Sequence, residues 1–231
     1  ATPYGYLHVV EMNTNDTVLL LRFRIEFFRK EKYIKIETYI TNIGSNPIED
    51  LEYKRFVDWD VWYPLLKSFD NYWGMDDIRK PGLNLAVAFL NETIAPGSVY
   101  MGFASLERPT DYDFGWDDYT SRGISDPVKA SISIDGKTSL YGDYCAIYDW
   151  VLGRLDPGET KAVHMIYAAG DTLEELEGNV EKALQQYAPV GGVVVQSAEL
   201  NLLIINFTIT AAIAAAFMTA TIVVLRKRIN T

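Results

Sequence analysis

Apolar and polar residues alternate along much of the first third of the chain. Between residues 17 and 28, Leu19, Leu21 and Phe23 alternate with Arg22 and Arg24. A period of two places one side of a strand on a core and the other side in water. Such runs, rich in β-branched and aromatic residues, predict strands at residues 6–12, 17–28, 32–42, 51–57, 85–90, 99–104, 130–134, 144–151 and 160–169.

Turn sequences separate these runs, among them Asn46-Pro47, Asp135-Gly136 and Asp156-Pro157-Gly158. Roughly nine or ten short strands follow one another with almost no helix between them, and two packed sheets bury such strands best. The sequence therefore predicts a mainly β fold, a two-sheet antiparallel β-sandwich.

One amphipathic helix is predicted at residues 172–187. Thr172 and Glu175 have the spacing of a capping box, and Leu173, Leu176 and Val180 recur at helical spacing on one side. We expect this helix to close the β-sandwich domain.

A long apolar run lies near the end of the chain. Residues 202–225 carry no charge, and Arg226, Lys227 and Arg228 follow at once. At about 1.5 Å per residue this run is long enough to cross a hydrocarbon layer of ~30 Å. Basic residues favour the cytoplasmic side, so residues before the run are expected outside the cell. The sequence therefore predicts an extracellular domain at 1–188, a linker at 189–201, a single transmembrane helix at 202–225 in the lipid bilayer and a cytoplasmic tail at 226–231. The first residue is Ala1 rather than Met, as in a processed chain.

Charge and cysteine content exclude several classes of function. The chain of 231 residues has 21 Lys and Arg against 31 Asp and Glu, a net charge of -10. Because nucleic-acid binding needs cationic side chains at phosphates, no nucleic acid is expected as a partner. A single cysteine, Cys145, excludes an intrachain disulfide, and two histidines leave little for a histidine metal site.

Three short segments resemble known extracellular proteins. Residues 39–48, YITNIGSNPI, resemble the T-N-x-G-x-x-x-I strand-turn-strand of immunoglobulin-like and CARDB-like sandwiches, and residues 155–160, LDPGET, resemble their L-x-P-G-E-T turn. Residues 53–61, YKRFVDWDV, are similar to a Y-x-R-x-x-D-W-D stretch of secreted and cell-wall-anchored prokaryotic β-sandwich proteins. With its predicted anchor, the chain is similar in architecture to archaeal surface-layer-associated proteins. The resemblance implies a fold and a location, and no catalytic residue.

Acidic residues gather in three predicted loops: Asp58 with Asp60, Asp76 with Asp77, and the set Asp111, Asp113, Asp117 and Asp118. Carboxylate oxygens suit calcium, and the third set is the candidate metal site, although it lacks the distal Glu of an EF-hand loop. Solvated turn carboxylates and ion pairs with arginine are the alternative. Paired carboxylates also serve glycoside hydrolysis.

Aromatic residues surround the acidic ones. Trp59, Trp62, Trp73 and Trp116 are candidates for stacking on sugar rings or for a subunit interface. The sequons at Asn15 and Asn91 predict glycosylation of surface turns.

Nucleophilic and cofactor chemistry have little support. His8 and His164 fall inside strand patterns, where a structural role is expected, and Cys145 lies in an apolar strand. No Gly-x-Ser-x-Gly elbow and no dinucleotide fingerprint occur. The sequence therefore predicts a chain that is not an enzyme. The leading hypothesis is a membrane-anchored structural protein of the cell surface that contributes to an external assembly by self-assembly or with other surface proteins. The alternatives are a tethered glycan-binding or glycan-processing module and an accessory subunit of a larger membrane complex.

Overall fold

A computed structural model describes residues 5–61, 71–76, 80, 82–90, 99–118, 123–128 and 140–187. The predicted strand 130–134, the linker, the transmembrane run and the basic tail with Arg226, Lys227 and Arg228 lie outside these residues. Within the described part of the chain, no helix is long and apolar enough to cross a membrane.

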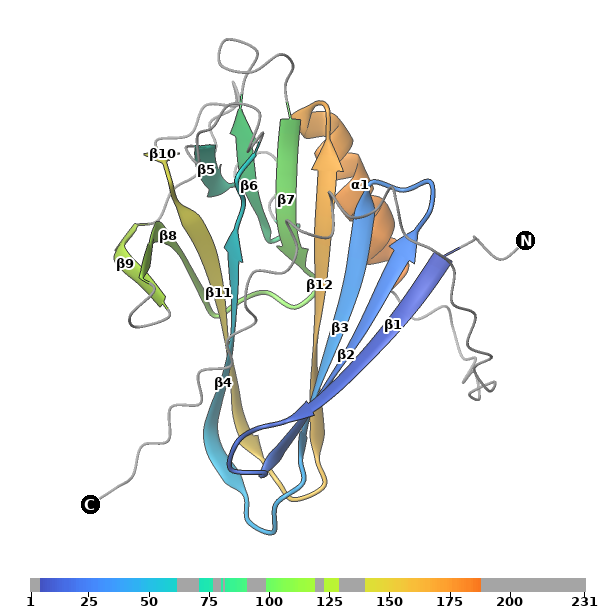
Figure 1. The fold of residues 1–231 in the computed structure, drawn as a ribbon, viewed down its shortest axis with the longest axis vertical. Coiled ribbons are helices and arrows are strands. Elements are labelled where there is room, and N and C mark those ends of the chain that lie inside the picture. Colours follow the sequence, from blue (N-terminus) through green and yellow to red (C-terminus); the bar gives the residue numbers. More distant parts are fainter. Residues whose placement is uncertain are drawn as a thin grey trace.

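Two antiparallel sheets form the domain (Figure 1). The larger sheet has the order β1-β2-β3-β12-β7-β6-β5-β10, and its strands are β1 (Gly5–Asn13), β2 (Leu19–Phe28), β3 (Tyr33–Asn42), β12 (Thr160–Gly170), β7 (Val99–Ser105), β6 (Leu85–Leu90), β5 (Asn71–Met75) and β10 (Leu140–Gly142). The smaller sheet has the order β4-β11-β8-β9, with β4 (Ile48–Asp58), β11 (Cys145–Leu155), β8 (Asp111–Asp118) and β9 (Gly123–Val128). The predicted mainly β fold of two antiparallel sheets is confirmed.

The core between the sheets follows from the period of two. Leu19, Leu21 and Phe23 of β2 are buried on one side, while Arg22, between them, is exposed. Aromatic rings fill much of this core, and Phe103 and Tyr148 approach to 4.4 Å between ring centroids. Buried aromatic side chains remove large apolar areas from water, which makes this layer the main stabilising contact between the sheets.

A helix forms a third layer on the outer side of the larger sheet. Strand β12 separates the two apolar clusters, because Met165 belongs to the cluster between the sheets and Ile166 to the cluster beneath the helix. The helix, α1 (Leu173–Gln185), contributes Leu176 and Val180 to this second cluster. A strand under both layers must be apolar on both sides, which explains the uninterrupted sequence LAVAFL of β6.

The start of α1 has the predicted cap. The backbone N–H of Glu175 donates to the hydroxyl of Thr172 at 3.1 Å, and the carboxylate of Glu175 accepts from the N–H of Asp171 at 2.7 Å. Two backbone N–H groups at the start of the helix thereby have hydrogen-bond partners. The predicted helix is confirmed, apart from small shifts of its ends.

Candidate functional site

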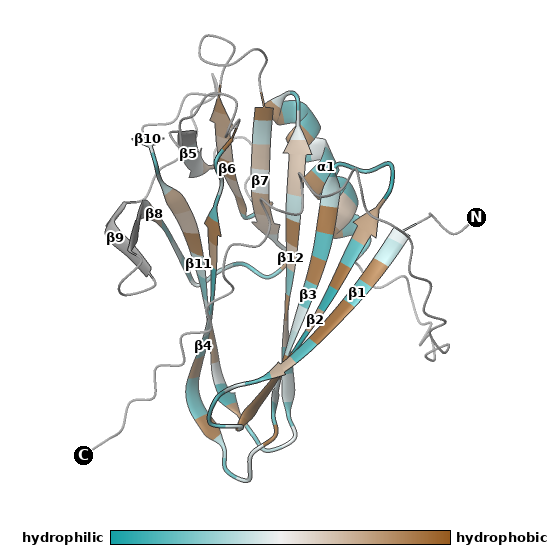
Figure 2. Cartoon of the chain, viewed as in Figure 1, coloured by the Kyte–Doolittle hydropathy of each residue, from teal (hydrophilic) through white to brown (hydrophobic). Residues whose placement is uncertain are grey.

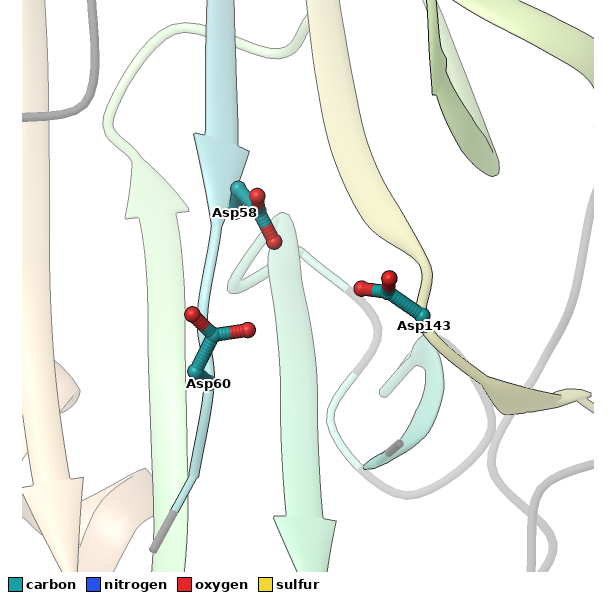
Figure 3. A group of neighbouring side chains, drawn as sticks. All are labelled: Asp58, Asp60 and Asp143. Carbon is teal, nitrogen blue, oxygen red and sulfur yellow. The ribbon is translucent and has the colours of Figure 1, made fainter. Parts of the chain in front are cut away.

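Three aspartates converge at the end of β4. Asp58 is the last residue of β4, Asp60 follows it, and Asp143 lies in the turn between β10 and β11. The register of the smaller sheet pairs Cys145 with Asp58, so the turn just before β11 lies beside the end of β4. As a result one carboxylate oxygen of each aspartate lies within 4.8 Å of those of the other two (Figure 3).

Repulsion and partial burial set the electrostatics of this aspartate cluster. Burial, followed by the negative charge of Asp143, raises the pKa of Asp60 to about 6. Asp58 and Asp143 are half-buried and Asp60 is exposed. Carboxylates so close to one another suit a hard cation such as calcium, which takes six to eight oxygen ligands. The sequence predicts Asp58 and Asp60 as an acidic pair but not Asp143, which is far away in the chain and comes near only through the register of the smaller sheet.

The four aspartates of the predicted calcium site do not share one loop. Asp111, Asp113, Asp117 and Asp118 belong to β8, an extended strand rather than a turn. At about 3.3 Å per residue, Asp111 and Asp118 lie on the order of 20 Å apart along the strand. One ion cannot take ligands from both ends, so the prediction of a single site made by these four residues is wrong.

Two of the four predicted ligand or interface tryptophans lie in the core. Trp73 is 0% exposed and Trp59 is 3% exposed, and their rings stack with centroids 6.0 Å apart. The prediction that these two rings stack on sugars or form a subunit interface is wrong, because they fill the space between the sheets. Trp62 and the side chain of Trp116 lie outside the described part of the chain.

Of the two predicted glycosylation sites, Asn15 and Asn91, the structure describes only the first. Asn15 is exposed in the turn between β1 and β2, as an acceptor of glycosylation must be. Its glycosylation stays a prediction. Asn91 lies outside the described residues.

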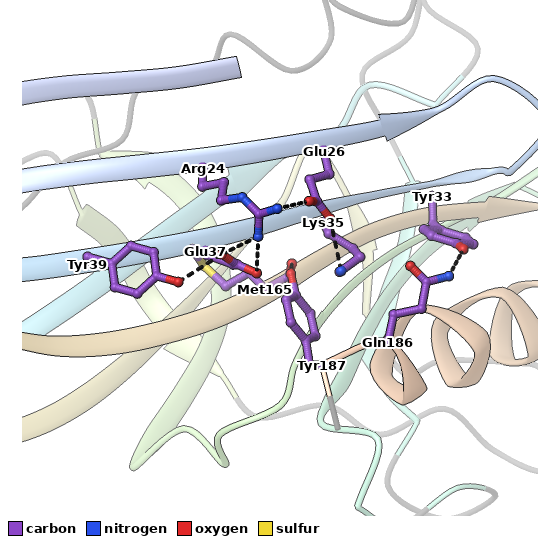
Figure 4. A network of polar contacts seen from close by, with 9 residues as sticks. All are labelled: Arg24, Glu26, Tyr33, Lys35, Glu37, Tyr39, Met165, Gln186 and Tyr187. Atoms are coloured by element: carbon purple, nitrogen blue, oxygen red, sulfur yellow. Dashed lines mark hydrogen bonds and ion pairs between the residues drawn. The ribbon is translucent and has the colours of Figure 1, made fainter. Parts of the chain in front are cut away.

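A network of ion pairs covers the outer side of β2 and β3 (Figure 4). The guanidinium of Arg24 donates to both carboxylate oxygens of Glu37 at 3.0 Å, and Lys35 lies 3.0 Å from Glu26. The ammonium of Lys35 also lies 4.5 Å from the ring centroid of Tyr187, just beyond α1. The opposite charges are paired with one another, so this network joins the helix end to the sheet and has a structural role.

The two histidines have different surroundings. Nδ1 of His164 lies 2.5 Å from Oε1 of Glu107, and this hydrogen bond raises the pKa of His164. His8 is exposed on β1, where its ring meets the edge of Phe27 at 6.0 Å between centroids. Cys145 is buried, as the sequence predicts.

The edge strand β1 is exposed along its whole length. Of the nine large apolar side chains that are exposed in the described residues, five belong to β1. They are Tyr6, Leu7, Val9, Val10 and Met12. Brown, hydrophobic bands accordingly run along β1 in Figure 2. One edge of the larger sheet thus presents unusual apolar area to its surroundings.

The two sides of β1 continue the two sides of β2. Pairing places Val10 beside Phe23 and His8 beside Ile25, on the side that forms the core further along the sheet. Glu11 pairs with Arg22 on the opposite side, and their side chains form an ion pair at 2.6 Å. The side of β1 that carries His8 and Val10 is therefore an uncovered extension of the core face in the described part of the chain.

Comparisons with known proteins give no family. No family model matches the chain, and no curated protein matches it. Among solved structures it is similar to a bacterial glucoamylase complexed with acarbose at 8% identity and a TM-score of 0.43, covering 78% of this chain and 24% of the glucoamylase. It is similar to a putative aldose 1-epimerase from Escherichia coli K12 at 12% identity and a TM-score of 0.36, covering 72% of this chain and 65% of that one. It is also similar to a polysaccharide lyase at 15% identity and a TM-score of 0.41, covering 77% of this chain and 27% of the lyase.

This chain spans only about a quarter of the glucoamylase and of the lyase. Similarities of this size transfer no activity to it. The expectation of a chain that is not an enzyme stays a prediction. The immunoglobulin-like resemblance stays a prediction.

Proposed function

We propose that the domain is an assembly module, which joins an external protein assembly through the exposed strand β1. The anchor of this assembly is the apolar run 202–225, and the predicted outside location of the domain belongs to the same proposal. The observation that carries it is the exposure of β1, which among the described strands pairs only with β2 and has exposed apolar side chains on both of its sides.

Sheet edges are normally protected against pairing with other chains. Proteins place lysine, proline or a bulge there, because the free N–H and C=O groups of an edge strand are a template for another strand. The sequence of β1, GYLHVVEMN, contains neither lysine nor proline, and its pairing with β2 runs from Gly5 to Asn13 without a shift. Its one charged residue, Glu11, is paired with Arg22 of the same sheet, so β1 has little protection, which supports an edge that is covered in the working protein.

Solvent access to β1 in the producing cells tests this function whatever the partner is. Val9→Cys and Val151→Cys form a matched pair, because these valines are 51% and 53% exposed on different sheets. We expect a membrane-impermeant maleimide to label Val151→Cys fully in intact cells and Val9→Cys at least tenfold more slowly. The purified, dissociated chain should label equally at both positions. Equal labelling of the two variants in intact cells as well would refute an assembly role for β1.

A second candidate function is glycan binding or processing, and the aspartate cluster favours it. A carboxyl group whose pKa lies near 6, beside a second carboxylate, resembles the acid and its partner in glycoside hydrolysis. Tyr141, 44% exposed, is the middle residue of β10, two positions before Asp143, and its ring is a candidate for stacking on a sugar.

Oligosaccharide binding by the full chain tests this second candidate. We expect Asp60→Asn to weaken binding at least tenfold and Asp50→Asn to leave it unchanged. Asp50 is an exposed residue elsewhere on β4 with φ of 52°, a conformation that asparagine adopts readily. A glycan array with no hit for the parent chain would remove this candidate.

The aspartate cluster also predicts a pH dependence of stability. Since folding raises the pKa of Asp60 from 3.8 to about 6, its stabilising contribution is complete below about pH 4 and is lost as the pH rises through 6. Asp60→Asn should therefore unfold at higher urea concentration than the parent at pH 7. We expect a gain of about 1 kcal/mol, smaller than the full shift implies because Asp60 is exposed.

Calcium provides the matched measurement for the same variant. If the three carboxylates hold the ion, millimolar calcium stabilises the parent and not Asp60→Asn. The parent then becomes the more stable of the two at pH 7, the reverse of the order without calcium. If calcium moves both unfolding midpoints equally, the cluster does not hold calcium. If Asp60→Asn differs from the parent by the same free energy of unfolding at pH 4 and at pH 7, the raised pKa of Asp60 is contradicted.

A further inference from the structure

We infer that the partner of β1 is β1 of a second copy of this chain, paired antiparallel about Val9. The two eight-stranded sheets then join edge to edge into one continuous sheet. This inference rests on the proposed function of β1 as an interface and adds the identity and the register of the partner.

The sequence of β1 is complementary to itself in this register. Val9 lies opposite Val9 of the second copy, Val10 opposite His8, and Met12 opposite Tyr6. Residues an even number of positions apart share a side of a strand, so each of these pairs brings together side chains of the same side. The side of β1 that extends the core face in one copy thereby continues into the same side of β1 in the second copy.

Charges fit the same register. Glu11 is the only Asp, Glu, Lys or Arg residue of β1, and Arg22 already pairs with it at 2.6 Å. Opposite Glu11 lies Leu7 of the second copy, and the two Glu11 residues are four positions apart along the new pair. No like charges face one another, which favours a second copy over an acidic partner strand.

The length of the strand selects this register among the symmetric ones. Centred on Val9, all nine residues from Gly5 to Asn13 find an opposite residue. Moving the centre to Val10 leaves the first two residues unpaired and places Val9 opposite Glu11. Moving it to Glu11 places the two Glu11 carboxylates directly opposite each other. The register about Val9 forms the most backbone pairs and opposes no charges.

Disulfide formation tests both the partner and the register. Directly opposite residues of antiparallel strands have Cα atoms about 4.5–5.5 Å apart, within the range that a disulfide spans. Val10 of one copy lies two positions from Val10 of the other, about 7–8 Å away, beyond that range. The one native cysteine, Cys145, is 1% exposed and does not compete.

We expect the full chain with Val9→Cys to form a covalent dimer under mild oxidation, in most of its molecules. Val10→Cys and the control Val151→Cys should form at least tenfold less. Chains with Leu7→Cys and chains with Glu11→Cys should cross-link when mixed and not when either is oxidised alone. These variants replace exposed side chains and need no refolding of the core.

The outcomes separate the inference from the proposed function. If Val9→Cys does not dimerise but is protected from maleimide in intact cells, β1 has a different partner and the inference is wrong while the proposed function stands. If Val9→Cys is neither protected nor cross-linked, both are wrong. Equal dimer yields from Val9→Cys and Val10→Cys would overturn the register.

Discussion

Replacing Trp73 by alanine is expected to lower the free energy of unfolding by about 3–5 kcal/mol, the range for removing a buried tryptophan ring. Trp73 is 0% exposed, and its ring packs against Trp59 and Phe114 with centroids 6.0 and 6.1 Å away. Truncation leaves a cavity between the two sheets that these neighbours only partly fill. Urea unfolding of the full chain, followed by near-ultraviolet circular dichroism, measures the loss. A domain of ordinary stability, about 5–15 kcal/mol, would lose a large fraction of it.

Val151→Ala is the control for this prediction. Val151 lies on β11 of the smaller sheet, and its side chain is 53% exposed. We expect its truncation to change stability by less than about 0.5 kcal/mol. If Trp73→Ala keeps the stability of the parent and instead loses glycan binding, Trp73 is a ligand residue and the position of its ring in the core is wrong.

Local sequence patterns predict those elements whose burial they reflect. The run 85–90 is predicted with the ends that β6 has, because a strand covered on both sides is apolar throughout. Thr172 and Glu175 predict the start of α1, since a cap depends on residues close together in the chain. In contrast, β8 has the sequence DYDFGWDD, which favours a loop. It forms a strand because β11 and β9 pair with it on both sides, and no local pattern records that pairing.

The candidate sites show the same limit. A period of two extends past the end of β4, with Val57, Trp59 and Val61 all buried, and this signal places Trp59 on the core side although acidic residues flank it. The approach of Asp143 to Asp58 depends on the register between β4 and β11, which are far apart in sequence. The pattern of β1 predicts a strand but cannot show that it is an edge, because strand order is a property of the whole sheet.

Replacing Gly170 by alanine is expected to destabilise the domain by about 3 kcal/mol, at the upper end of the range for overpacking. A Cβ atom at this position would lie 2.5 Å from the backbone nitrogen of Leu176 and 2.8 Å from the carbonyl oxygen of Thr172. Both are backbone atoms at the start of α1, so no side-chain rotation relieves the contact. The helix must move outward, which weakens the cap at Thr172 and withdraws Leu176 from the outer side of the sheet.

Gly178→Ala is the control in the same helix. Apart from its chain neighbours and the helix's own backbone, no atom of the described residues lies within 4 Å of the added Cβ. Alanine favours helix over glycine, so this variant should gain roughly 0.5–1 kcal/mol. Urea unfolding, followed by circular dichroism at 222 nm, compares both variants with the parent. If Gly170→Ala is as stable as the parent, α1 does not dock as closely as described. If Gly170→Ala is destabilised as expected, the displaced helix exposes the apolar cluster beneath it. We then expect this variant to aggregate through that cluster, and not through the β1 pairing that the Val9→Cys cross-link detects. The larger sheet thus has two apolar surfaces, the exposed strand β1 and the cluster beneath α1. Specific pairing through β1 requires α1 to keep the cluster beneath it covered.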